Sequence, residues 1–198
     1  MLAPRKYNDQ AGSVASDTEK DLTGTAFSPP AVDGKAYTNS GLTLFIRKSA
    51  GITRLLKEHR ALLTLVEGPY PTNPAKTVLK SDRLLLIGGG IGITGVVSFL
   101  RCHPNVKLFQ SVKAADQCLL DALSGVLDEV PEKKIVVGKR LEVDALLREE
   151  ASLGWSKIAV IVCGPAEMCD DVRAAVARIG KEKAGQCSFE LEVDSFSW

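Results

Sequence analysis

The sequence has few residues of the kinds that hold metals or cross-link small folds. Its 198 residues include two histidines and five cysteines, and no two cysteines form a CxxC pair. This spacing does not match the common zinc motifs, so we expect reduced thiols and no metal. The net charge is only +1 at pH 7, which gives no bulk field to attract nucleic acid or an anionic membrane. Any phosphate must therefore be bound by a local site.

A transmembrane span and a targeting segment are also lacking. The uncharged run 84–100 is shorter than the roughly 20 residues that a span needs. It also contains five glycines, and each weakens a helix by about 1 kcal/mol. Residues 1–35 are polar and do not resemble a signal peptide. We therefore expect a cytoplasmic chain whose length suits one domain and part of another.

The first part of the chain shows little of the apolar periodicity that predicts helices and strands. Residues 1–40 are rich in Ser, Thr, Asp, Gly and Pro and lack apolar periodicity, which indicates a disordered or loose N-terminal arm. Residues 41–80 contain two expected strands, at 42–46 and 62–66, with a short helix at 52–59 between them. These elements are too few for a complete β domain.

Residues 81–198 alternate between short apolar strands and helical patterns. Strands are expected at 84–87, 106–109, 134–137, 157–162 and 188–193, and helices at 91–102, 115–127, 141–149 and 165–179. Pro165 is expected in the first turn of the last helix, and Gly180 at its end. This alternation predicts an α/β class, a Rossmann-like parallel sheet with helices on both faces. Ligands of such sheets bind at the carboxyl ends of the strands.

A glycine-rich segment at 88–95 follows the first of these strands and opens a helix. Glycines at such a position let the backbone approach a pyrophosphate, whose charge is stabilised by amide N–H groups. The alternative is a glycine turn that only packs the strand against the helix. The βαβ context favours the dinucleotide site, whose expected contacts are Gly89, Gly90, Gly92, Ile93 and Thr94.

The end of the second strand bears on the choice between NAD(H) and NADP(H). NAD-selective sites place Asp or Glu about 20 residues after the glycines, whereas this strand ends in Gln-Ser-Val-Lys at 110–113. A hydroxyl and a cation suit a 2′-phosphate, so Ser111 and Lys113 are expected to favour NADP(H). Lys139 and Arg140, after the third strand, supply a second positive arm. The alternative is that these are ordinary surface side chains.

Two further segments are compatible with a cofactor. Cys163-Gly164-Pro165 ends the fourth strand at the same edge; Gly164 permits close approach, and Cys163 is expected to face the crevice. A cysteine in an apolar strand is more often a small core residue. Gly51-Ile52-Thr53-Arg54 begins the short helix, which is a second helix start compatible with phosphate.

These motifs resemble the ferric reductase and NADPH oxidase branch of the ferredoxin-NADP reductase superfamily, the fungal ferric-chelate reductases most of all. The matching segments, in order and spacing across residues 41–198, are 44–47, 51–56, 66–70, 89–94, 163–168 and 189–198. In that family NADPH binds the glycine loop and passes hydride to FAD, and electrons then cross a membrane through haems to ferric iron. The resemblance implies that 41–80 is the C-terminal remnant of the FAD-binding β domain and 81–198 the NADP-binding domain.

The resemblance also implies roles for single residues. Gly51, Thr53 and Arg54 would contact the FAD diphosphate. Cys163 would lie near the nicotinamide as a catalytic residue, and Trp198 would cover the flavin ring. Cofactor contacts are also expected from Gly164, Pro165 and Met168.

The sequence departs from the family in ways that concern the flavin. The His-Pro-Phe-Thr type of flavin anchor is absent, as are the membrane helices with their paired haem histidines. Pro71 replaces an expected glycine, and Gln110 stands where a Trp is common. We therefore expect an NADPH-binding reductase domain with an incomplete FAD site, completed by a missing flavin and haem portion. The alternatives are a non-catalytic nucleotide-binding fragment and a soluble subunit whose partner chain holds FAD.

Overall fold

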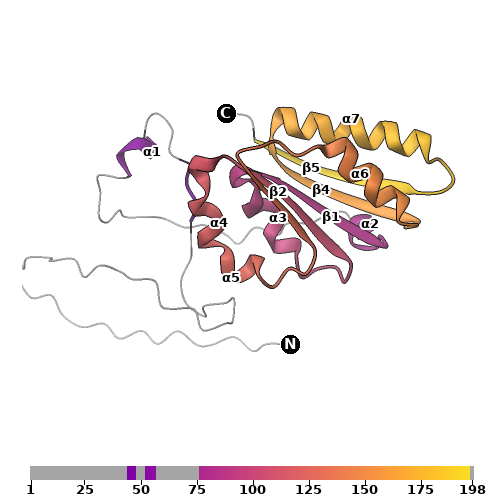
Figure 1. The fold of residues 1–198 in the computed structure, drawn as a ribbon, viewed down its shortest axis with the longest axis horizontal. Coiled ribbons are helices and arrows are strands. Elements are labelled where there is room, and N and C mark those ends of the chain that lie inside the picture. The colour runs from indigo at the N-terminus through magenta and orange to yellow at the C-terminus, as the bar shows by residue number, and fades with distance from the viewer. Residues whose placement is uncertain (1–43, 48–51, 57–75, 197–198) are drawn as a thin grey trace, which may run out of the picture. The chain divides into compact units, whose positions relative to one another are not determined.

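The computed structural model describes residues 44–47, 52–56 and 76–196. The last of these ranges forms a five-stranded parallel sheet with helices on both faces (Figure 1). The strands are β1 (Arg83–Gly89), β2 (Val106–Val112), β3 (Lys133–Val137), β4 (Lys157–Pro165) and β5 (Ser188–Phe196). The Rossmann-like α/β class predicted from the sequence is confirmed.

The strand order in the sheet is β3-β2-β1-β4-β5. The chain moves outward from β1 through β2 to β3, then returns past β1 to form β4 and β5. The order therefore reverses between β1 and β4, which makes their carboxyl ends the switch point of the sheet. Gly88 of β1 is paired there with Cys163 of β4 on one side and with Gln110 of β2 on the other.

Each face of the sheet packs against its own set of helices. Leu84 and Leu86 point to one face and Leu85 and Ile87 to the other, because successive side chains of a strand alternate. All four are fully buried, which explains why 84–87 is a continuous apolar run. The first face is covered by α3 (Ile93–Val96), α4 (Cys118–Ala122) and α5 (Ser124–Leu127), and the second by α6 (Val143–Ser152) and α7 (Ala166–Glu182).

Two of the expected helices are broken into short pieces. The one expected at 91–102 consists of η1 (Gly90–Gly92), α3 and η2 (Val97–Phe99), of which η1 and η2 are 3-10 turns. Gly92 and Gly95 weaken this helix and pack tightly on Cys163, so tertiary contact overrides the helical period. The one expected at 115–127 consists of η3 (Ala114–Asp116), α4 and α5, with the break at Leu123.

The last helix departs from its expected ends. Pro165 is the N-cap of α7, not a residue of its first turn. The helix does not stop at Gly180 but continues to Glu182, because Gly180 keeps a negative φ and faces the ring of Phe189. Its apolar face is as predicted, since Val172 and Ile179 are fully buried. Strands β2, β4 and β5 each extend three residues beyond their expected carboxyl ends.

The segments before the sheet are only partly described. The strand expected at 42–46 is not formed in its described part, because Leu44–Arg47 has no regular secondary structure. The short helix is present as α1 (Ile52–Leu55), and α2 (Lys76–Leu79) was not expected. The arm at 1–40 and the strand at 62–66 lie outside the described residues. Across the described ranges, no helix is both long and apolar enough to cross a membrane.

Candidate functional site

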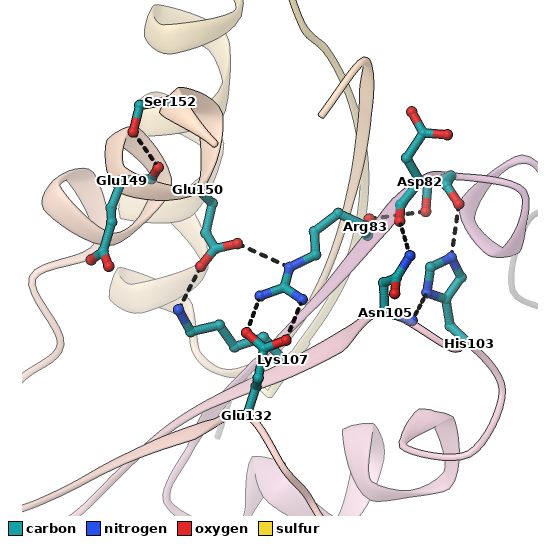
Figure 2. Close-up of polar contacts among 10 residues, drawn as sticks. Asp82, Arg83, His103, Asn105, Lys107, Glu132, Glu149, Glu150 and Ser152 are labelled. Atoms are coloured by element: carbon teal, nitrogen blue, oxygen red, sulfur yellow. Dashed lines mark hydrogen bonds and ion pairs between the residues drawn. The ribbon is translucent and has the colours of Figure 1, made fainter. Parts of the chain in front are cut away.

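At the amino edge of the sheet, charged side chains form ion pairs with one another (Figure 2). Arg83 Nε donates to Glu150 Oε2 at 2.9 Å, and its two terminal nitrogens donate to Glu132 at 2.8 and 2.5 Å. Lys107 Nζ donates to the other Glu150 oxygen at 2.6 Å. The hydrogen bond from Arg83 holds the pKa of Glu132 below its usual value. Two cations thus balance two carboxylates. The ion pairs of the cluster connect β1 and β2 to α6.

His103 beside this cluster is also committed to the fold (Figure 2). Its Nδ1 accepts the backbone N–H of Asn105 at 3.1 Å, so Nε2 carries the proton and donates to Ser81 O at 2.7 Å. The residue is 8% exposed. Both ring nitrogens are therefore engaged by the backbone.

The glycine turn lies at the carboxyl edge, at the switch point between β1 and β4. Gly90 leaves the strand with φ of +55°, a left-handed conformation that favours glycine. Apart from Gly90, its chain neighbours and the backbone of the turn itself, no heavy atom in the described part of the chain lies within 4 Å of the position that a Cβ on Gly90 would take. The backbone at Gly90 is therefore open to an approaching group.

The neighbouring glycines serve close packing instead. A Cβ on Gly92 would lie 2.0 Å from the carbonyl oxygen of Cys163, and one on Gly164 would lie 2.3 Å from Met168 Cε. Gly89 is likewise closed in by Met168 and Pro165, at 2.8 Å each. Gly90 thus has room for an approaching ligand, whereas Gly89, Gly92 and Gly164 let the turn, β4 and α7 pack closely.

Two of the expected phosphate contacts are already engaged inside the turn. Thr94 Oγ1 donates to Ile91 O at 2.9 Å. The backbone N–H of Ile93 bonds to carbonyl groups of Gly90 and Ile91, and its side chain is fully buried. These groups would donate to a phosphate only after leaving their present partners.

The residues expected to meet a 2′-phosphate lie at neighbouring strand ends. Ser111 is half-buried and is the sheet partner of Gly89. Lys113 and Lys139 are exposed just beyond β2 and β3, whose ends are joined by a hydrogen bond from Gly138 N to Val112 O at 2.8 Å. The strand ends thus bring Ser111, Lys113 and Lys139 to one side of the glycine turn.

Arg140 differs from these bases because it already has a carboxylate partner. Its Nη2 lies 3.2 Å from Glu167 Oε2, in the first turn of α7, and both side chains are strongly exposed. Exposed pairs of this kind are weak. Arg140 would have to exchange Glu167 for any phosphate.

Cys163 is in the core and does not face an open crevice, which corrects the expectation from sequence. Its side chain is 1% exposed and lies beneath Gly95, where a Cβ would be 2.5 Å from its sulfur. Burial, together with the Asp194 carboxylate 3.7 Å away, raises the pKa of this thiol to about 12. Cys163 is therefore protonated at neutral pH, a form that is not nucleophilic.

Two residues at this edge were missed from the sequence. Asp194 is exposed near the end of β5, where the rule that sites follow strands would have found it. Gln110 is fully buried in β2 and donates to Gly90 O at 2.9 Å. A polar residue directly after the apolar pair Leu108-Phe109 was the available signal.

The residues expected to contact FAD are only partly described. Thr53 is half-buried and Arg54 is exposed in the four-residue helix α1. Gly51 and Trp198 lie outside the described residues.

No family model matches this chain, and no curated protein matches it. Nine chains among solved structures do match. One is the crystal structure of full-length CYP116B46 from Tepidiphilus thermophilus, with 20% sequence identity and a TM-score of 0.48. That match covers 76% of this chain and 19% of the other, so this chain spans about a fifth of that protein's length. A likeness of this size assigns neither a family nor a function.

Proposed function

We propose that the carboxyl edge of this sheet binds NADPH in preference to NADH. The observation that carries the proposal is the strand order β3-β2-β1-β4-β5 with the glycine turn at its switch point. Dinucleotides bind across this point in sheets of that order, with the pyrophosphate at the first strand-to-helix turn. The open backbone at Gly90 fits such a phosphate, since a side chain there would fill the space that the ligand needs.

The roles of the other residues follow from their places around the turn. Ser111 and Lys113, with Lys139 beside them, would hold the 2′-phosphate by hydrogen bonds and charge. β1 packs closely against α7 through Gly89, Gly164 and Met168, and this packing would exclude water from below the site. The bound dinucleotide would supply a hydride. The Asp194 carboxylate would border the nicotinamide end, and the buried Cys163 thiol, which lies 3.7 Å from it, would support it from within the core.

We further propose that the chain acts as the NADPH-binding domain of a flavin-dependent ferric-chelate reductase, in which hydride passes to FAD and electrons go on to ferric iron. This part rests on the resemblance of the sequence motifs. Of the residues assigned to FAD in the first half of the chain, Thr53 and Arg54 are described. A further flavin and haem portion would then complete the reductase.

The buried Cys163 favours a second candidate, a nucleotide-binding module that does not itself carry out hydride transfer. A thiol that is 1% exposed offers no open surface to a nicotinamide ring. The two candidates differ when NADPH and FAD are added together to the full chain. Bleaching of the visible flavin absorbance, faster than in a protein-free mixture, supports the reductase, and binding of NADPH without bleaching supports the module.

Binding at the turn is tested by a pair of matched glycine variants in the full chain, titrated with NADPH by calorimetry. Gly90 and Gly185 both have positive φ and open space, but Gly185 lies before β5, at the amino edge. Alanine at either position should cost about 1–2 kcal/mol of stability because of its left-handed backbone. Only Gly90→Ala should weaken NADPH binding. Equal affinity for NADPH in both variants would contradict the site.

A further inference from the structure

The side chain of Gln110 holds the glycine turn from below. Its Nε2 donates to Gly90 O at 2.9 Å and to Ser111 O at 3.1 Å. Because both neighbours are carbonyl oxygens, only the nitrogen of the amide can face them. The residue is 0% exposed, so water does not compete for these bonds.

The oxygen of the same amide makes no hydrogen bond that could account for the burial of this side chain. Gln110 Oε1 is buried and has no hydrogen-bond partner within the described ranges. It lies against Gly88, where a Cβ would be 1.9 Å away. An unpaired buried oxygen is unfavourable, so the contribution of Gln110 lies in its two donated bonds. Gly88 has no side chain at the point that the amide occupies.

We propose that Gln110 is a positioning residue that fixes the backbone of the turn for a pyrophosphate; this inference rests on the proposed function. The bond to Gly90 O restrains the glycine of the turn whose Cβ position is open. The second bond ties the same amide to Ser111, the residue proposed for the 2′-phosphate. A single side chain thus sets the spacing between the two phosphate subsites. It touches neither phosphate itself.

If Gln110 positions the turn, replacing it should affect the binding of two ligands differently in a calorimetric titration of the full chain. Adenosine 2′-monophosphate needs only the strand ends at Ser111 and Lys113, whereas NADPH also needs the turn. Gln110→Met keeps the length of the side chain and removes its N–H donors. We expect it to weaken NADPH binding about tenfold, because the bond that restrains Gly90 is lost, and to leave binding of adenosine 2′-monophosphate unchanged. The matched control is Gln186→Met, in the exposed loop before β5, which should change neither affinity.

Each outcome distinguishes the inference from the proposal beneath it. Normal NADPH affinity in Gln110→Met overturns the inference alone, and so does equal weakening of both ligands, which is the sign of a merely structural residue. Failure of the unaltered chain to bind NADPH overturns the proposed function. If Gln110→Met does not fold, Gln110→Asn keeps the amide but withdraws it from Gly90 O. The same selective loss of NADPH binding is expected there, and its absence again overturns the inference.

Discussion

Arg83 Nε and Glu150 Oε2 lie 2.9 Å apart, although 67 residues separate them in the sequence. Arg83 is 2% exposed and Glu150 is fully buried. Glu132 and Lys107 complete the cluster, which joins the first residue of β1 to β2, α6 and the approach to β3. Buried charges need such partners, because each one alone would be costly to desolvate.

Removing one partner from this cluster should strongly destabilise the fold. We expect Glu150→Leu to lower the free energy of unfolding by about 3–5 kcal/mol, since it leaves Arg83 and Lys107 with excess positive charge. Urea unfolding followed by circular dichroism measures the loss. The control is Glu182→Gln, which breaks the exposed pair with Arg148 and should change the midpoint little. A midpoint for Glu150→Leu equal to that of the control would show that the cluster is not structural.

Two glycines should respond to alanine in opposite directions. Gly92→Ala places a Cβ 2.0 Å from the Cys163 carbonyl oxygen, a backbone atom that cannot move aside. It should destabilise the chain by about 1–3 kcal/mol, as overpacking does. Gly180 lies inside α7, and the nearest atom to a Cβ there is Phe189 Cδ2 of β5, at 3.8 Å. Gly180→Ala should therefore stabilise the chain by about 1 kcal/mol. Shifts of equal sign in thermal unfolding would refute the packing described at the turn.

Much of the sheet was predictable because the central strands β1 and β4 contain continuous apolar runs. The run from Leu84 to Ile87 needs burial on both faces, and only a parallel sheet covered by helices provides it. The breaks in the helices were not predictable, since they depend on contacts made across the sheet. Gly95, for example, packs on Cys163, which lies far along the chain. Gly180 looked like a helix end because glycine often is one.

High pH should reveal the buried thiol of Cys163. Its pKa is raised from 9.0 to about 12, so below pH 9 the thiol is protonated in both the folded and the unfolded chain. Between these two values the unfolded thiol loses its proton while the folded one keeps it, so stability falls as pH rises. We expect Cys163→Ala to show a shallower fall in melting temperature above pH 9 than the unaltered chain. Identical slopes would contradict the burial of this thiol.

Selectivity for the 2′-phosphate should depend on Lys113. Replacing its positive charge by a carboxylate in Lys113→Glu should abolish or invert the preference for NADPH over NADH. Lys80→Glu makes the same charge change in an exposed lysine before β1, at the amino edge, and serves as the control. Dissociation constants for both nucleotides, measured at one ionic strength because salt screens such contacts, give the comparison. An unaltered preference in Lys113→Glu would remove this residue from the site.

The candidate site was less predictable than the fold because its details depend on strand register. The sequence located the glycine turn and the five strands, since both follow from the position of apolar runs, but it ended β2, β4 and β5 three residues too early. It could not show that Gln110 reaches Gly90, which depends on the pairing of β2 with Gly88. Nor could it show that the Thr94 hydroxyl bonds within its own turn.

The most direct test of the account is a calorimetric titration of the unaltered full chain with NADPH and with NADH. A hydrogen bond to a charged group contributes about 1.5–3 kcal/mol, so contacts from Ser111 and Lys113 to the 2′-phosphate predict roughly tenfold to hundredfold tighter binding of NADPH. Equal dissociation constants would contradict the preference for NADPH, and absence of binding by both nucleotides would contradict the site at the carboxyl edge.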